Sequence, residues 1–393
     1  MRLLNHLCFY CFVLAILFVS RPASAQTTSA PIPADSTVTQ QVDYAFLPAL
    51  AYSSDLGLIG GGIMSRYKFE DGIAPFYSYL HVNAIISTKG LISSSFLFDK
   101  PRFLGKKQRF TSEFYVSRFL QSQFYGIGNY APLPDALQDS SDFYFYRSFS
   151  TGIELLLRRQ VLKHSTKNKL DIYGVANFEY RTPWGNDNGQ YIIQQQPLGV
   201  DGMRAISLGG GLVWENRDSE FEPTKGNYAK AGIKVGNSIF GSSADYFLFE
   251  SDVRAYTHFF LLKKITFANR LSFQHSSGNV PYWLLPELGG EETMRGYPEN
   301  RFRDDNTLLL NTELRTWLLE FPEYDVRLGG TLFMDIGRTF ANKTAFGDVI
   351  GDLNYTFGFG GTSSFFNNNF ILRGDVGFSG EGYGIYFTAG YLF

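Results

Sequence analysis

The sequence predicts an all-β protein, a sixteen-stranded antiparallel transmembrane β-barrel with an inward-folded long extracellular loop. From residue 43 to the end, segments of roughly ten to fifteen residues alternate between apolar and polar side chains and are separated by turn residues. The chain is rich in residues common in such barrels, with 40 Gly, 38 Phe and 24 Tyr. Helical periodicity is almost absent, which disfavours a soluble helical domain.

The N-terminus is typical of an exported chain. Arg2 provides a basic start, residues 7–19 form an apolar run, and the run is followed by small residues up to Ala25. We interpret residues 1–25 as a signal peptide cleaved near Ala25, which predicts export. Together with the barrel pattern, this predicts location in the cell outer membrane. A membrane anchor is the alternative, but a spanning helix needs about 20 apolar residues.

The remaining chain predicts one domain after a short leader. Residues 26–42 are rich in Thr, Ser, Pro and Gln and predict a disordered periplasmic segment. Residues 43–393 predict the barrel. Both cysteines, Cys8 and Cys11, lie in the predicted signal peptide, so we expect neither a disulfide nor a thiolate metal site in the mature chain.

Alternation can be followed residue by residue in two segments. Apolar and polar side chains separate in 325–337, with Val326, Leu328, Leu332, Met334 and Ile336 opposite Asp325, Arg327, Thr331, Phe333 and Asp335. They also separate in 307–318, with Leu308, Leu310, Leu314 and Leu318 opposite Asn311, Glu313 and Arg315. Because neighbouring strand side chains point to opposite faces, one face is expected to meet lipid and the other a polar interior.

A soluble β-sandwich would show the same period, and the C-terminus favours the barrel. Alternate residues from Tyr383 to Phe393 form one apolar face that ends on a phenylalanine. We predict that this strand closes the barrel. Phe387, Tyr391 and Phe393 are the residues expected to form a C-terminal signal for barrel assembly.

Sixteen strands are predicted, and an even number places both chain ends on the periplasmic side. Their ranges are 43–52, 57–69, 75–88, 90–99, 108–120, 143–160, 168–182, 204–216, 226–238, 244–260, 264–276, 304–319, 325–338, 352–361, 369–379 and 382–393. The long connections then fall on the outer side, at 121–142, 183–203, 277–303 and 339–351.

One of these long connections carries a specific motif. Residues 286–315 read PELGGEETMRGYPENRFRDDNTLLLNTELR. This stretch resembles the BamA/TamA family of outer-membrane assembly and secretion barrels, also called the bacterial surface antigen family. The resemblance implies that the loop tip, Arg295-Gly296-Tyr297, folds into the barrel, and that its arginine meets Glu313 and Asp335 on the next two strands.

The residue types agree with this structural loop lock. Glu313 and Asp335 fall on the polar phase of adjacent predicted strands, where a guanidinium could bridge them by charge-assisted hydrogen bonds. Gly296 would allow a tight turn beside the arginine. The alternative is a solvated surface loop with an arginine near its tip.

Other fragments resemble the same family along most of the chain. They are 125–129, the stretch 214–218 with Pro223 and Gly226, and the last three strands. One departure is large, because family members that insert or export proteins carry POTRA domains before the barrel. Here only residues 26–42 precede the first predicted strand, so we expect a member lacking POTRA domains.

The sequence offers no catalytic, cofactor or metal site. The glycine runs 60–62 and 209–211 lack the Lys-Ser/Thr and helix of a phosphate loop. A hydrolase would need a histidine beside a nucleophile, but His275 and Ser276 are strand neighbours and should face opposite sides. The formal net charge of −2 disfavours a nucleic-acid partner.

Three functions remain open. The first is outer-membrane protein assembly or export with a separate periplasmic protein partner or barrel client. The second is a non-enzymatic structural barrel that holds a partner in the outer-membrane lipid. The third is a passive pore, which an inward-folded loop would obstruct.

Overall fold

The computed structural model describes residues 40–70, 73–105, 107–129, 143–165, 168–185, 190–365 and 371–393. The predicted signal peptide, 1–25, and residues 26–39 of the predicted leader lie outside the described residues.

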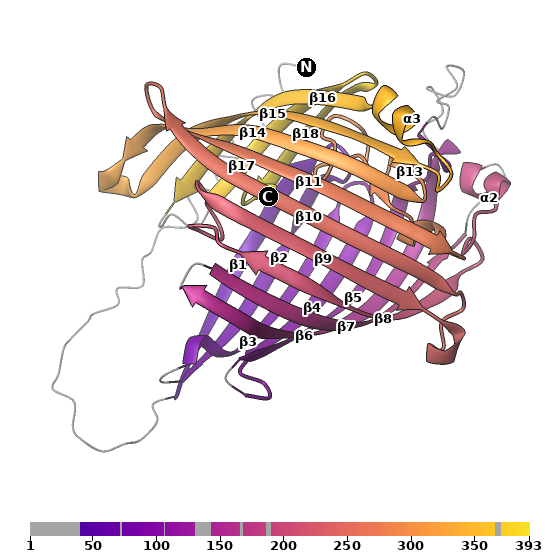
Figure 1. Cartoon of the computed structure of the whole chain (residues 1–393), viewed down its shortest axis with the longest axis horizontal. Helices are drawn as coiled ribbons and strands as arrows, with labels where there is room; N and C mark the ends of the chain where they lie inside the picture. The colour runs from indigo at the N-terminus through magenta and orange to yellow at the C-terminus, as the bar shows by residue number, and fades with distance from the viewer. Residues whose placement is uncertain are drawn as a thin grey trace.

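Sixteen strands of the described chain form one closed antiparallel barrel, which confirms the predicted fold (Figure 1). Each strand pairs with its neighbour in sequence, and β14 follows β11 around the wall. The strands are β1 Gln40–Ser53, β2 Gly57–Glu70, β3 Ile73–Ser87, β4 Leu91–Pro101, β5 Gln108–Gln123, β6 Phe145–Ser165, β7 Asn168–Pro183, β8 Met203–Glu215, β9 Gly226–Gly236, β10 Tyr246–Phe260, β11 Lys264–Gly278, β14 Asn306–Phe321, β15 Val326–Phe340, β16 Asn354–Phe365, β17 Ile371–Ser379 and β18 Gly382–Ala389.

The strand ends lie close to the predicted ones except at the C-terminus. The predicted last strand runs to residue 393, but β18 ends at Ala389. Gly390 has φ of +85°, a left-handed conformation that breaks the extended chain. Asp325, predicted at a strand start, instead lies in the preceding turn with φ of +51°.

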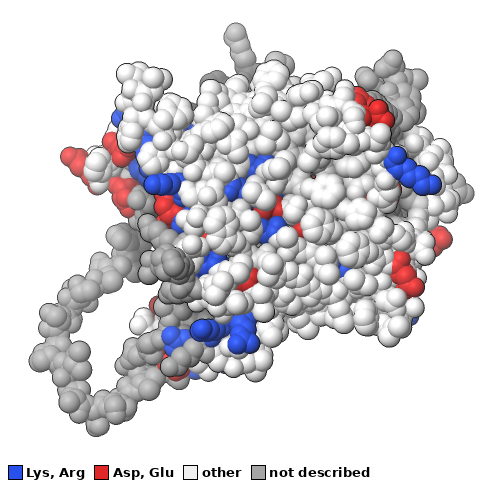
Figure 2. Space-filling model, in the orientation of Figure 1, with Lys and Arg blue, Asp and Glu red and all other residues white. Residues whose placement is uncertain are grey.

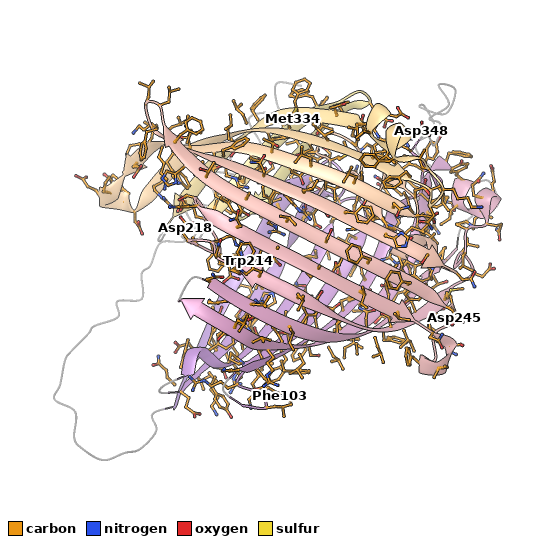
Figure 3. All side chains as sticks on the ribbon, viewed as in Figure 1. Phe103, Trp214, Asp218, Asp245, Met334 and Asp348 are labelled. Carbon is orange, nitrogen blue, oxygen red and sulfur yellow. The ribbon has the colours of Figure 1, made fainter. Side chains whose placement is uncertain are left out.

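The two ends of the barrel differ. We call the end where β1 begins and β18 finishes the terminal end, and the opposite one the loop end. The loop end carries the long connections, including α2 (Tyr191–Gln195) and α3 (Phe346–Gly351), both at the right of Figure 1. In Figure 3, Asp245 and Asp348 lie at the loop end, while Asp218 lies at the terminal end. No helix of the described residues is long and apolar enough to cross a membrane.

The wall is apolar outside and polar inside, as strand alternation requires. Large apolar side chains are exposed on the outer face of nearly every strand, for example Phe46, Met64, Phe96, Phe114, Leu332 and Phe357. Met334 projects outward from β15 in Figure 3, and most of the face in Figure 2 is uncharged. Buried polar residues occupy the inner phase, among them Ser65, Asp171, Thr266, Asn311 and Thr331.

The barrel is closed by a very short seam. β1 pairs with β2 along all fourteen residues, but in the described chain its register with β18 contains only Ser53↔Tyr386. The Ser54 N–H donates to the Ile385 carbonyl at 2.9 Å, and the Ile385 N–H donates to the Ser54 hydroxyl at 2.9 Å. Most of the β1 edge therefore has no strand partner within the described residues.

Candidate functional site

The long connection between β11 and β14, residues 279–305, forms the candidate site, and we call it the inner loop. It contains a short helix η4 (Tyr282–Leu284) and a small hairpin of β12 (Glu287–Leu288) and β13 (Phe302–Arg303). The β5–β6 connection and strand β6 hold it. The Gly128 N–H donates to the Arg303 carbonyl at 2.6 Å, and the Tyr282 hydroxyl donates to that of Tyr146 at 3.1 Å.

At the tip of the inner loop, Arg295 is fully buried and surrounded by carboxylates. Its Nε and Nη2 donate to the two oxygens of Asp335, at 3.0 and 2.8 Å. Its Nη1 donates to Glu313 at 2.6 Å and to Asp375 at 3.0 Å. The guanidinium also stacks on the ring of Phe333, 3.4 Å from the ring centre. The structure therefore brings together Arg295 and the two acids named from the sequence.

Asp375, on β17, is the acid that sequence reasoning missed. Two more arginines complete the cluster, since Arg315 donates to Glu313 at 2.7 Å and Arg373 forms an ion pair with Asp375 at 3.1 Å. Three guanidiniums thus face three carboxylates, and their formal charges cancel. Burial would lower the pKa of the Arg295 guanidinium, but Asp335, Glu313 and Asp375 raise it above its ordinary value. The inner phase that Asp375 shares with Arg373 was the signal that could have identified it.

Gly296 and Tyr297 place the tip against the wall. Gly296 has φ of +103°, and a Cβ there would approach the backbone of Gly377 and Phe378 to 2.9 Å. Only glycine fits this close approach without strain. Tyr297 is buried and packs on Phe302, with ring centres 4.9 Å apart.

The inner loop also contacts both sides of the seam. On the β18 side, the Gly296 N–H donates to the Tyr386 hydroxyl at 3.1 Å, and Arg301 pairs with Glu381 at 2.7 Å. On the β1 side, the Glu299 N–H donates to the carboxylate of Asp55 at 2.9 Å. A single loop therefore bridges the two strands that share only one residue pair.

Acidic groups gather where the inner loop meets the β1–β2 turn. The Glu299 side chain is exposed, but the surrounding protein displaces part of its hydration shell. That desolvation, followed by the charge of Asp55 and of Glu287, Glu291 and Glu292, raises the pKa of Glu299 to about 8. Desolvation and the neighbouring Glu292 raise the pKa of Glu291 to about 7.

At the terminal end, residues 390–393 form a tail that turns into the lumen. The prediction that the last strand and its apolar face run to Phe393 is wrong, because Phe393 lies beyond the end of β18. Its ring is 4% exposed and packs with Tyr256 and Ala268. Arg315 donates to the Phe393 carbonyl at 2.9 Å and stacks on Tyr391, 4.2 Å from the ring centre. Of the predicted signal residues, only Phe387 remains on the outer face, 41% exposed.

The β8–β9 turn, residues 216–225, reaches across the same end. The Glu222 carboxylate accepts from Trp317 Nε1 at 2.6 Å and from Arg327 Nη2 at 2.8 Å. Burial raises the pKa of Asp218, but hydrogen bonds from Thr224 and Lys225 outweigh it and lower the pKa overall. The turn that sequence reasoning matched to a family fragment is thus fixed to β14 and β15.

The residues considered for catalysis or metal binding have other contacts. His275 Nδ1 lies 2.7 Å from the Asn306 side-chain oxygen, and the Ser276 hydroxyl donates to the Asp305 carbonyl at 3.0 Å. His258 Nδ1 lies 3.2 Å from the Thr224 carbonyl. Within the described ranges, no group of three or more His, Cys, Asp and Glu residues is arranged to hold a metal ion.

Comparison with solved structures shows the same fold elsewhere. BamA from Haemophilus ducreyi lacking POTRA domains 1–3 matches with a TM-score of 0.59 at 14% identity, over 90% of this chain and 70% of that one. CdiB from Acinetobacter baumannii matches with a TM-score of 0.53 at 16% identity, over 90% of this chain and 66% of that one. CdiB from Escherichia coli matches with a TM-score of 0.58 at 12% identity, over 88% of this chain and 62% of that one. The chain therefore spans only about two thirds of the length of the structures that it matches.

Sequence comparison places the chain in a family. No curated protein is similar enough in sequence to count as a match. The sequence pattern of the Omp85 superfamily domain, however, matches residues 78–386, most of the chain. The predicted resemblance to BamA-type barrels is confirmed at this level. The protein is an outer-membrane β-barrel that belongs to the Omp85 superfamily.

Proposed function

We propose that this barrel acts in the assembly or export of other outer-membrane proteins, by opening its seam to an incoming strand. The observation that carries the proposal is the edge of β1, which pairs with β18 only at Ser53↔Tyr386. In hydrocarbon, an unpaired backbone group costs several kcal/mol because no water can satisfy it. A strand from a client chain would satisfy this edge by β-augmentation.

The composition of β1 supports the proposal. Pro48 has no N–H, and proline is confined mainly to edge strands because it cannot donate to a neighbour. The side chains of Tyr44 and Phe46 are 71% and 73% exposed on this strand. A client strand could cover them as it pairs with the edge.

In this proposal the inner loop controls the seam. Arg295 fixes the loop tip to β14, β15 and β17, while Tyr386 and Asp55 connect it to β18 and to the β1–β2 turn. Widening the seam requires loss of the contacts on one side. Opening the seam to a client strand makes and breaks no covalent bond, so this role needs no catalytic group. A separate periplasmic protein would deliver the client.

A reversible disulfide across the seam tests the proposal. The described residues contain no cysteine, and antiparallel partners lie within disulfide reach. In cells that depend on this chain, the double variant Ser53→Cys/Tyr386→Cys should lose assembly or export when oxidised and recover when reduced. Amounts of folded outer-membrane proteins and of exported proteins are the measurements.

The matched control is Ala45→Cys/Ser65→Cys, which links β1 to β2 instead and should leave activity unchanged in both redox states. Equal activity of the oxidised and reduced seam variant would overturn seam opening. That result would favour the alternative of a structural barrel that holds a partner in the outer membrane.

A further inference from the structure

A transverse trough crosses the outer face of β2 to β4. Strand register aligns a row of small side chains, Gly62, Ala84 and Ser94, with Pro48 at one end and Val116 at the other. The neighbouring rows are large and apolar. Leu50, Ile86 and Ile92 lie on the loop-end side, and Phe46, Met64, Val82, Phe96 and Phe114 lie on the terminal side.

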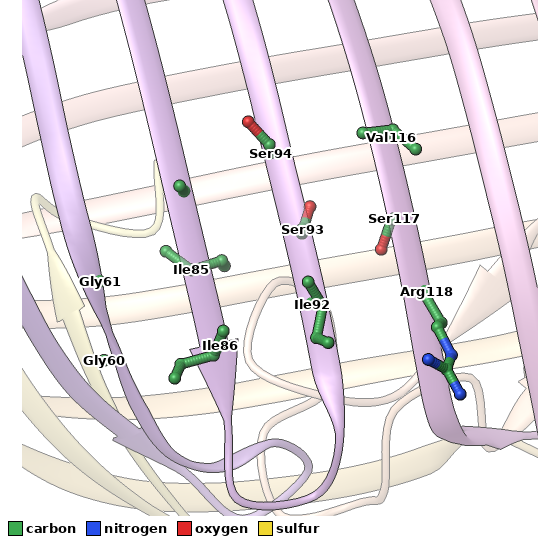
Figure 4. Close-up of a pocket in the computed structure, with 11 residues that line it drawn as sticks. Gly60, Gly61, Ile85, Ile86, Ile92, Ser93, Ser94, Val116, Ser117 and Arg118 are labelled. Carbon is green, nitrogen blue, oxygen red and sulfur yellow. The ribbon is translucent and has the colours of Figure 1, made fainter.

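The trough has the size and character of a site for an alkyl chain. Its volume is about 530 Å³, and its lining includes Gly60, Ala84, Ile86, Ile92 and Val116 (Figure 4). The one hydroxyl in the small row is already satisfied, because Ser94 Oγ donates to the Asn83 carbonyl at 2.8 Å. Nothing in this row therefore requires water.

A positively charged side chain, Arg118, lies at one end of the trough. Arg118 follows Ile92 in the same row and lies beside the β3–β4 turn in Figure 4, toward the loop end. It shares the outer phase of β5 with Val116 and Leu120, which are 37% and 39% exposed. Its guanidinium stacks on Trp184, 4.3 Å from the ring centre, and Arg147 approaches the same ring at 5.6 Å.

Arg118 is suited to binding an anion. A charged side chain facing lipid is costly unless it reaches the interface or a counter-charge. No carboxylate of the described residues forms an ion pair with Arg118, which is exposed on the outer face. A planar guanidinium binds phosphate oxygens in pairs, and tryptophan favours the headgroup region of a membrane.

We propose that this surface binds one lipid whose headgroup carries an anionic phosphate, with the phosphate on Arg118 beside Trp184 and an alkyl chain in the trough. The small row admits the chain because flanking large side chains stand above it on both sides. Arg147 adds positive charge next to the phosphate position. Bound lipid would then cover the wall next to β1, the strand that bounds the seam.

Native mass spectrometry of the detergent-solubilised full chain tests the proposal with two lipids of identical tails. Phosphatidylglycerol is the probe with an anionic phosphate, and diacylglycerol is the probe without one. The parent barrel should retain phosphatidylglycerol preferentially. Arg118→Ala should reduce that retention about tenfold, the effect of losing a charge-assisted hydrogen bond, while retention of diacylglycerol stays the same.

Two variants test the trough itself. Ala84→Phe fills the small row, and Gly60→Leu fills its edge, where an added Cβ would meet no atom within 4 Å. Both should reduce retention of both lipids, and thermal unfolding checks that the barrels fold. Retention equal to the parent in both filled variants would overturn the proposal.

Arg159→Ala is the matched charge control, since Arg159 is also exposed on the outer face but lies toward the terminal end of β6. It should bind phosphatidylglycerol as the parent does. An equal loss in Arg159→Ala and Arg118→Ala would mean general attraction to the charged wall and would refute a specific site. Displacement of the lipid by equimolar inorganic phosphate would also refute it, because the anion alone would then be the ligand.

Discussion

The Arg295 side chain links the tip of the inner loop to three strands of the barrel wall. It has no exposed surface, and its guanidinium reaches acids on β14, β15 and β17. A buried ion pair adds little net stability when it forms, because both partners lose water. Removing one partner is different, since it leaves uncompensated charge in the interior.

Arg295→Ala should therefore destabilise the barrel by about 3–5 kcal/mol, the usual cost of breaking a buried pair. The temperature at which the detergent-solubilised barrel unfolds is the measurement. Arg102→Ala is the control, because Arg102 is exposed in the β4–β5 turn. If the Arg295→Ala barrel unfolds at the same temperature as the parent, the tip contacts are not a structural lock.

At the level of single residues, the sequence predicted those partners of Arg295 that lie soon after the inner loop in the chain. Glu313 and Asp335 lie on the next two strands in the inner phase, so alternation was enough to propose them. Asp375 lies 80 residues from Arg295, on β17, two strands beyond Asp335, and alternation does not show that the loop tip reaches that far. Phe393 was misplaced because alternation gives no sign of the turn at Gly390.

At the scale of elements, docking of the inner loop depends on the protonation of its own carboxyl groups. Glu299 and Glu291 have pKa values raised to about 8 and about 7, above the value of about 4.3 for an unfolded glutamate. The docked loop therefore binds more protons than the released loop between these values. Docking is strongest below the unfolded pKa and weakens as pH rises through the folded pKa values.

We expect amide hydrogen exchange in residues 289–300, corrected for intrinsic rates, to speed up as pH rises from about 5 to about 9. Glu299→Gln should flatten this dependence, because its amide does not titrate. Glu323→Gln, an exposed change in the turn before β15, is the control. Protection that stays constant with pH in the parent would show that these carboxyls do not govern docking.

Elements of the wall were far more predictable than the loops. A strand exposed to lipid on one face and to a polar lumen on the other alternates apolar and polar residues, so its own sequence predicts it. The path of the inner loop depends on partners such as Gly128, Tyr146 and Tyr386, which come from distant connections and strands. No local pattern encodes these contacts, and only the family resemblance of the loop motif suggested that it folds inward.

In the whole molecule, the lumen is occupied from both ends. The inner loop fills the loop end, while the β8–β9 turn and the tail cross the terminal end. This arrangement disfavours a passive pore. The parent barrel should show no large stable conductance steps in planar bilayers.

Shortening the inner loop should open the path. Leu288 and Phe302 are paired in the small hairpin, so residues 289–301 can be replaced by Asn-Gly, a favoured two-residue hairpin turn. The shortened barrel should give larger steps than the parent. Large stable steps from the parent itself would instead support the pore.

The inward tail has a practical consequence for anyone who labels this protein. Whatever follows Phe393 must start inside the lumen, next to Arg315 and Tyr256. An affinity tag or fluorescent fusion attached there would compete with the tail for its own site, and the labelled barrel would no longer report the native one. The β9–β10 connection is a safer place, because Ile239 is 87% exposed at the loop end, away from the seam strands.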